Sequence, residues 1–485
     1  MNLNKAIDKS KKNIVIIFGL LLSLGIVVAF CVVFFFNKNV VIPKWVSLQE
    51  KELSYNGKLT VTLSKGRVTI KGLGVLWTSP KEYVFQDILI SDLDNDDRSE
   101  LISLVWKRGK YGNAMPFWVK ENDNSVAQHL FIYELRTDGE PKQKWFASDV
   151  GTAIRRMKLM DQNPAILLTE TIEDENDLWR WESFGLKNMD NEVRLVAFGD
   201  NIIHKEIYEY ARMKKGGKFD FLYEPFKKEI ESADIAVIQA ETILAHDENA
   251  VSGYPRFGSP LAVGKAIKNA GFDVAVCGNN HALDKGIYGI NVTTDFYKNN
   301  DILCVGIQNT SDAEYRPYEL ISRHGIRFAL FSYTYGTNDI SVSDKYPNAV
   351  HYLPANADEE ESLISDIQKA KEEADICLIF VHWGEEYSTD ITEEQRRYSD
   401  IFALAGADVV IGTHPHVVQP METITRPDGK NMTVFYSLGN FRAYQGRSEQ
   451  TKSGAEAILT IEHCFDGVKV SSAELSELNA YVTLE

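Results

Sequence analysis

Two histidines, His414 and His416, are separated by one residue and follow an apolar run that ends at Gly412. Pro415, between them, restricts the backbone. Imidazole groups on one stiff turn are well suited to bind a transition-metal ion. Taken alone, the pair is more simply explained as two solvated loop histidines, so the metal hypothesis depends on the rest of the chain.

Further side chains that can bind metals also follow apolar, strand-like runs, namely Asp200, Glu241, Asn280, His281 and His382. Each has an ordinary explanation by itself, such as a helix cap for Asp200, a turn for Asn280 and a core position for His382. Strand ends lie side by side along the rim of a sheet, so these residues can converge with the histidine pair despite their separation in sequence. Coincidence explains the whole pattern less well than a metal site.

The residue types fit a pair of divalent ions. Two metals ~3.5–4 Å apart need a carboxylate between them, with imidazole and amide ligands around it. Glu241 is the predicted bridge. The other ligands divide between the two ions, with Asp200 and His416 at one and Asn280, His382 and His414 at the other. Mixed nitrogen and oxygen donors suit Mn, Fe or Zn equally.

His281 is the predicted catalytic acid, because it adjoins the predicted ligand Asn280 and could protonate a leaving group. Asp284, three residues later, could hold the tautomer of His281. A helix N-cap or an exposed surface charge explains Asp284 equally well. The hypothesis takes the two residues as a catalytic pair, with His281 as the acid and Asp284 as its partner.

The elements that must position these side chains alternate between strand and helix from residue 191 onward. Apolar runs typical of strands precede the candidate ligands, and amphipathic segments typical of helices, such as 261–270, 359–373 and 393–405, lie between them. The tail, 455–484, returns to strand-like alternation. This pattern predicts an α/β domain over residues 191–485.

Residues 46–190 differ, with short runs that alternate apolar and polar residues as strands do. A weak internal repeat relates Trp77 and the runs after it to Trp145 and the runs after it. We expect a small all-β domain containing two related sheets, which resemble blades of FG-GAP repeats.

An acidic loop in the first copy of the repeat contains Asp92, Asp94, Asp96 and Glu100. Carboxylates at alternate positions of a tight loop can bind Ca²⁺. The loop resembles the calcium loops of FG-GAP repeats, but it has Asp97 where they usually have a glycine that permits the sharp turn. An acidic hairpin turn without a metal is an equally good interpretation.

The N-terminus has the pattern of a membrane anchor. Residues 1–12 are basic, and 13–36 contain an uninterrupted apolar run of 23 residues from Ile14 to Phe36. At ~1.5 Å per residue, this run can cross a ~30 Å hydrocarbon core. It exceeds the apolar region of about 7–15 residues in a cleaved signal peptide, which is the alternative. The lysines predict a cytoplasmic N-terminus, one transmembrane helix, a linker at 37–45 and an extracellular remainder.

The chain of 485 residues has a formal net charge of −17. We do not expect a nucleic-acid partner, because phosphate backbones bind basic surfaces. An anionic substrate would need a local positive charge, which divalent metal ions provide.

Residues from about 194 to 441 resemble the CapA family of capsule poly-γ-glutamate synthesis proteins. The shared motifs, in order, are Gly199-Asp200, Glu241-Thr242, Ala270-Gly271-Phe272-Asp273-Val274 with Asn279-Asn280-His281-Ala282-Leu283-Asp284, His382-Trp383-Gly384-Glu385-Glu386-Tyr387, Gly406-Ala407-Asp408-Val409-Val410-Ile411-Gly412 with His414-Pro415-His416, and Ser437-Leu438-Gly439-Asn440-Phe441. The family usually has Asn-Leu-Glu where this chain has Gln239-Ala240-Glu241. Calcineurin-like phosphatases also have a D-x-H histidine that the first motif lacks, although His204 lies four residues after Asp200.

The resemblance implies a calcineurin-like metallophosphatase fold, an α/β/β/α sandwich, tethered at the cell membrane. The implied partners are an anionic capsule polymer such as poly-γ-glutamate and other membrane proteins of capsule synthesis. Two functions are compatible with it. One is a metal-dependent hydrolase acting on an anionic polymer or a phosphoester. The other is a component that binds or exports the polymer through the same metal pocket without cleaving it.

Overall fold

The computed structural model describes residues 40–484, except 73, 112–116, 122, 137–139 and 161–163. The chain divides into two compact units, with the boundary between Met189 and Asp190. The predicted cytoplasmic tail at 1–12 and transmembrane anchor at 13–36 lie outside the described residues. Among the helices that are described, none combines the length and apolar character needed to cross a membrane.

The described part of the first unit contains three antiparallel sheets of four strands each. Their strands are β1 (Lys51–Tyr55), β2 (Leu59–Ser64), β3 (Arg67–Gly72) and β4 (Val75–Thr78); β5 (Val84–Ser91), β6 (Glu100–Arg108), β7 (Val126–Glu134) and β8 (Lys142–Asp149); and β9 (Ile154–Met160), β10 (Ile166–Thr171), β11 (Asn176–Glu182) and β12 (Gly185–Met189). Alternation along β2 buries Leu59, Val61 and Leu63 against the next sheet, as period-2 patterning requires.

The internal repeat follows these sheets. Trp77 lies in β4 and Trp145 in β8, which are the last strands of the first and second sheets. The prediction of two related sheets is therefore incomplete. The repeat begins only at Trp77, in β4, so it does not reveal the sheet that β4 forms with β1, β2 and β3.

The second unit is built on two mixed sheets. The first has the order β18-β17-β14-β13-β26-β27, with β25 beside the end of β13. The second has the order β19-β20-β21-β22-β24-β23. The bounds are β13 (Glu192–Asn201), β14 (Ile235–Gln239), β17 (Val274–Val276), β18 (Leu303–Val305), β25 (Asn440–Arg442), β26 (Ser453–Cys464) and β27 (Gly467–Asn479) in one; and β19 (Tyr318–Arg323), β20 (Ile326–Thr334), β21 (Ile376–His382), β22 (Val409–Thr413), β23 (Val418–Thr425) and β24 (Asn431–Leu438) in the other.

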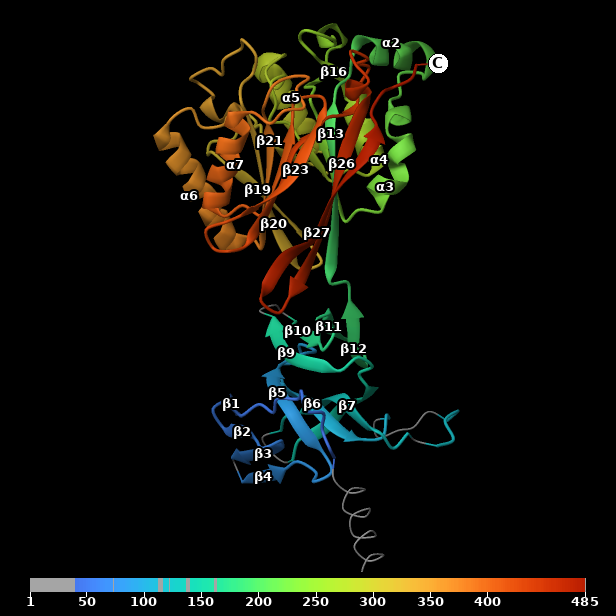
Figure 1. Ribbon diagram of the computed structural model, residues 1–485, viewed down its shortest axis with the longest axis vertical. Coiled ribbons are helices and arrows are strands. Elements are labelled where there is room, and N and C mark those ends of the chain that lie inside the picture. Colours follow the sequence, from blue (N-terminus) through green and yellow to red (C-terminus); the bar gives the residue numbers. More distant parts are fainter. Residues whose placement is uncertain are drawn as a thin grey trace, which may run out of the picture. The chain divides into compact units, whose positions relative to one another are not determined.

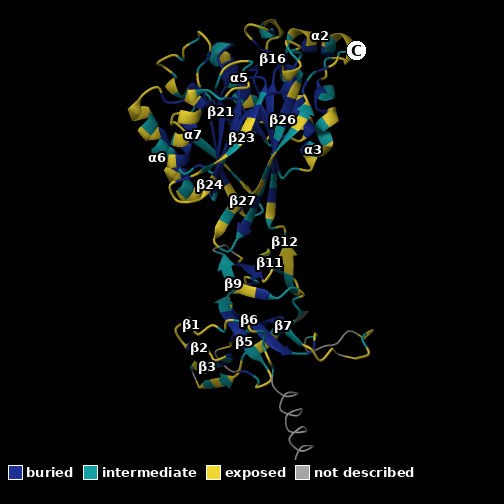
Figure 2. Ribbon diagram, viewed as in Figure 1, coloured by how far each residue is buried: buried dark blue, intermediate teal, exposed yellow. Residues whose placement is uncertain are grey.

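The two sheets pack face to face, with helices on both outer faces (Figure 1). Apolar residues of both sheets form one shared core, and the strands hold most of the buried residues (Figure 2). The first sheet is covered by α2 (Lys205–Lys214), α3 (Lys227–Glu231), α4 (Leu261–Ala270) and α5 (Gly286–Lys298), and the second by α6 (Ala357–Glu373) and α7 (Glu393–Ala405). The predicted α/β class is confirmed, and the layers are those of an α/β/β/α sandwich.

Gly412, in β22, allows a very close approach to the neighbouring strand. A Cβ atom there would lie 2.1 Å from the carbonyl oxygen of Tyr436 and 2.5 Å from Nε1 of Trp383. The indole Nε1 of Trp383 donates to that same carbonyl oxygen at 2.9 Å. A side chain at Gly412 would therefore disturb the strand directly before His414.

Replacing Gly412 with alanine should lower the free energy of unfolding by about 1–3 kcal/mol, because backbone and a buried indole must move. Denaturant unfolding followed by circular dichroism measures this. The matched control is Gly336→Ala, where a Cβ atom would have open space; it should change stability by less than about 1 kcal/mol. Equal stability of the two variants would contradict the packing described for β22.

Candidate metal centre

Asp200 and Glu241 form the centre of the site. Asp200 is the penultimate residue of β13, and Glu241 lies two residues after β14. Both are fully buried. Within the described chain, Oδ1 of Asp200 and both carboxylate oxygens of Glu241 have no hydrogen-bond partner. Buried carboxylates without partners are very costly unless they are protonated or bind a cation, so their chemistry fits a metal site.

His382, the last residue of β21, lies beside Glu241 from the second sheet. Its Nε2 is 3.1 Å from Oδ1 of Asn280, 3.1 Å from Nδ1 of His414 and 3.5 Å from Oε1 of Glu241. Its Nδ1 is 3.1 Å from Oγ1 of Thr413. A proton on Nδ1, donated to Thr413, would leave Nε2 free to bind a metal.

The turn after β22 brings His416 to Asp200. Nδ1 of His416 is 3.2 Å from Oδ2 of Asp200 and 3.8 Å from Oε2 of Glu241. The backbone N–H of His414 donates to the same Asp200 oxygen at 3.1 Å. His414 and His416 have φ angles of 102° and 59°, a region that costs a non-glycine residue about 1–3 kcal/mol. The surrounding contacts hold both histidines in this strained turn.

The donor atoms fall into two groups that share one residue. Glu241, His382 and His414 form one group, and Asp200, Glu241 and His416 form the other, with the atoms of each group within 4.8 Å of one another. Glu241 thus occupies the position of the predicted bridge. The Asn280 amide oxygen adjoins the first group through its contact with His382.

The expectation that all these strand ends share one sheet is wrong. Asp200, Glu241 and Asn280 follow β13, β14 and β17 of the first sheet, whereas His382 and the His414–His416 turn follow β21 and β22 of the second. The ligands meet because the two sheets pack face to face and the ends of their central parallel strands come together.

Burial controls the protonation of the cluster. It raises the pKa of Glu241 well above the ordinary value, and the neighbouring Asp200 raises it further. Burial also lowers the pKa of His382 and His414, and nearby histidines lower both further. The imidazoles therefore stay neutral, as metal ligation requires, and a cation would favour ionisation of the carboxylates.

His281 and Asp284 lie close together beside the cluster. Nδ1 of His281 is 2.7 Å from Oδ2 of Asp284, and both residues are largely buried. Asp284 also accepts from the backbone N–H of Phe257 at 2.6 Å, and the Phe257 ring packs edge-on against His281 at 4.7 Å. Asp284 is therefore neither a surface charge nor the N-cap of α5, which is Lys285. Its carboxylate fixes the proton of His281 on Nδ1.

Two tyrosines near the ligands were not predicted. The Tyr335 ring lies 4.7 Å from that of His414 and follows β20, so the strand-end pattern could have identified it. The Tyr387 ring lies 5.8 Å from that of His416, and Tyr387 ends the motif that begins at His382, although no role was predicted for it. His204 belongs to neither ligand group. Its Nδ1 accepts from the backbone N–H of Tyr444 at 3.3 Å, and burial lowers its pKa to about 4.

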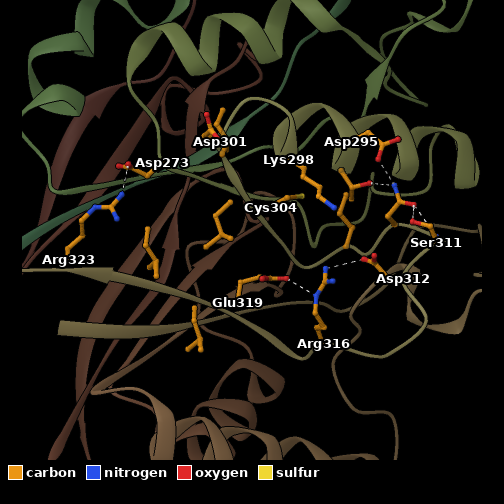
Figure 3. Close-up of a pocket in the computed structure, with 17 residues that line it drawn as sticks. Asp273, Asp295, Lys298, Asp301, Cys304, Ser311, Asp312, Arg316, Glu319 and Arg323 are labelled. Atoms are coloured by element: carbon orange, nitrogen blue, oxygen red, sulfur yellow. Dashed lines mark hydrogen bonds and ion pairs between the residues drawn. The ribbon is translucent and has the colours of Figure 1, made fainter. Parts of the chain in front are cut away.

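A separate cavity of about 550 Å³ is lined by residues of β18 and β19, the edge strands of the two sheets (Figure 3). None of the predicted site residues lines it. Its two arginines are paired, with Arg323 3.0 Å from Asp273 and Arg316 3.1 Å from both Asp312 and Glu319. No histidine of the described chain lines the cavity, so it lacks the imidazole donors that distinguish the metal-ligand cluster.

The acidic loop of the first unit lies against the ammonium group of Lys144, which belongs to β8. Carboxylate oxygens of Asp92, Asp94 and Asp96 lie within 4.8 Å of one another, as the ligands of one ion would. Nζ of Lys144, however, lies 2.6 Å from buried Glu100 and 2.7 Å from Asp94. This ammonium group would compete with Ca²⁺ for the carboxylates, and a calcium ion here stays a prediction.

After exposure to Mn²⁺ or Zn²⁺ and removal of free metal, the protein should retain about two ions per chain. His416→Ala should retain about one ion per chain. Glu241→Gln should retain fewer ions than His416→Ala, because Glu241 contributes to both groups. Elemental mass spectrometry measures the ratio. The exposed His246 provides the control, and His246→Ala should match the wild type. A wild type without bound metal, or a normal ratio in His416→Ala, would contradict the assignment.

Two known proteins of capsule biosynthesis are similar to part of this chain. The chain is 36% identical over 185 residues to the PGA biosynthesis protein CapA of Bacillus subtilis (strain 168), covering 38% of this chain and 45% of that protein. It is 33% identical over 197 residues to the capsule biosynthesis protein CapA of Bacillus anthracis, covering 39% and 44%. The chain thus matches less than half the length of these curated relatives.

Among solved structures, the calcineurin-like phosphoesterase YfkN from Bacillus subtilis aligns with 60% of this chain and 91% of that chain, with a TM-score of 0.35 and 16% identity. Residues 194–445 match the family described as bacterial capsule synthesis protein PGA_cap, and this range includes every predicted ligand and both predicted catalytic residues. Because the match extends over more than half of the sequence, the chain belongs to the PGA_cap family of bacterial capsule synthesis proteins.

Proposed function

We propose that this protein is a metal-dependent hydrolase of capsule formation, which cleaves a bond in an anionic polymer or a phosphoester. The observation that carries the proposal is the pair of buried carboxylates, Asp200 and Glu241, whose unpaired oxygens are surrounded by three histidines. Divalent ions, when bound, supply Lewis-acid activation of the substrate and of water. Two such ions would outweigh the charge of the carboxylates, which favours an anionic substrate in a chain that is otherwise acidic.

The His281–Asp284 pair supports a hydrolytic rather than a purely structural site. Asp284 orients the imidazole through the 2.7 Å contact at Nδ1. The other ring nitrogen, Nε2, can then carry the proton that a leaving group needs. Phe257 packs against the ring and limits its movement.

The proposed setting is the outer face of the cell membrane. The apolar run at 13–36 would anchor the chain, with the N-terminus in the cytoplasm and both compact units outside. The names of the matched relatives place them in PGA and capsule biosynthesis. We therefore propose an anionic capsule polymer such as poly-γ-glutamate as the substrate, and other membrane proteins of capsule synthesis as partners.

Full-length protein loaded with Mn²⁺ should shorten poly-γ-glutamate, measured as a fall in polymer length by gel filtration. His281→Ala should lower kcat by about 10²–10⁴-fold while metal content stays normal, because His281 transfers a proton and is not a predicted ligand. His246→Ala should retain full activity.

The same assay separates cleavage from binding. Polymer that is retained by the metal-loaded protein without being shortened would contradict the hydrolase and support a component that holds or exports the polymer. A wild type that neither retains nor shortens the polymer would exclude both roles for this substrate, and phosphoesters would then be tested.

A further inference from the structure

Most arginines of the second unit are neutralised by a carboxylate. Eight of its eleven form ion pairs, whereas Arg256, Arg442 and Arg447 form none with described residues. Arg442 is buried and packs over Phe226. Arg256 and Arg447 are exposed. In a chain with a net charge of −17, an exposed arginine without an acidic partner is available to bind an anion.

Arg447 lies beside the metal-ligand cluster on an aromatic support. Its guanidinium carbon is 4.3 Å from the centre of the Tyr387 ring, and that ring is 5.8 Å from the ring of His416. The backbone N–H of Tyr387 donates to the carbonyl of Pro415 at 2.7 Å. The turn that positions His416 therefore also positions the surface on which Arg447 is stacked.

The support is held from a second loop as well. The Tyr387 hydroxyl accepts from Nε2 of Gln445 at 3.1 Å, and Oε1 of Gln445 accepts from Nδ2 of the buried Asn440 at 2.9 Å. Tyr387 has a φ of 69°, which a tyrosine adopts only when its surroundings hold it there. Arg447 also forms a hydrogen bond with the Tyr387 side chain, and its remaining N–H groups can bind a carboxylate or phosphate.

Arg256 lies on the loop between β15 (Leu244–Ala245) and β16 (Ser259–Pro260). Phe257, the next residue, contacts both members of the His281–Asp284 pair. The loop of Arg447 thus reaches the site through Tyr387, whose ring lies beside that of His416. The loop of Arg256 reaches it through Phe257, which contacts His281 and Asp284.

We propose that Arg447 and Arg256 are specificity-determining residues, which bind anionic groups of the substrate that neighbour the reacting bond. This inference rests on the proposed function. At Arg447, one aromatic ring separates the guanidinium from the nearest metal ligand, so the arginine would hold a neighbouring group and not the reacting one. Such binding is equally strong before and during the reaction, so its loss should change KM and leave kcat nearly constant.

The test uses full-length, Mn²⁺-loaded protein with labelled poly-γ-glutamate, and measures Kd by fluorescence anisotropy together with KM and kcat. Arg447→Ala and Arg256→Ala should each raise Kd and KM at least about tenfold, because each removes a charge-assisted contact. The kcat should stay within about twofold of the wild type. Arg447→Lys should show a smaller increase, because lysine keeps the charge without the planar fork.

Arg396→Ala is the matched control. Arg396 also lies over a tyrosine ring, 5.8 Å from the centre of Tyr436, but it is paired with Glu422 at 3.2 Å. This variant should bind and cleave the polymer as the wild type does. Polymer with methyl-esterified carboxylates should bind the wild type and the arginine variants with equal weakness.

Each arginine is judged by its own variant. An unchanged Kd and KM, a fall in kcat at constant KM, or a loss of bound metal would overturn the assignment of that residue. A wild type that neither binds nor cleaves the polymer would exclude poly-γ-glutamate as the substrate of the proposed function, and would overturn this inference, which depends on that polymer. In contrast, a wild type that binds the polymer normally, together with variants that bind it equally well, would overturn only the assignment of the two arginines.

Discussion

The site in the second unit depends on two buried carboxylates that no positively charged side chain of the described residues neutralises. Asp200 and Glu241 are fully excluded from solvent, and their free oxygens face imidazoles that burial keeps neutral. Without a cation, one of the two must be protonated, because adjacent buried negative charges repel. The protein could have stabilised the pair with arginine or lysine, as it does at many surface acids. The neutral imidazoles at this position instead leave the negative charge to be balanced by a bound metal ion.

The sandwich makes this arrangement possible by bringing the ends of five strands together from two sheets. Close backbone contacts are needed at these ends, and glycines provide them. A Cβ atom at Gly199, directly before Asp200, would lie 2.1 Å from the carbonyl oxygen of Gly439. Gly412 allows an equally close approach two residues before His414. These contacts fix the ligands more firmly than loops alone would, which a preformed metal site requires.

The sequence predicted the local elements well, and it identified donor residues that the structure brings together, because both depend on apolar runs and on the residues that follow them. Helices at 261–270 and 393–405 are present at those bounds. The division of the ligand strands between two sheets was not predicted, because strand pairing joins residues far apart in sequence. The left-handed backbone of Tyr387 and the position of Lys144 among the acids of the first unit also depend on tertiary contacts. The same reason explains why neither unpaired arginine was recognised from the sequence.

The central claim is that one glutamate is shared by two metal positions. Anomalous diffraction from crystals of the Mn²⁺-loaded protein tests it most directly. The account predicts two peaks ~3.5–4 Å apart, with the carboxylate of Glu241 between them, His416 at one peak and His382 with His414 at the other. A single peak that Glu241 does not contact, or peaks outside this cluster, would contradict it.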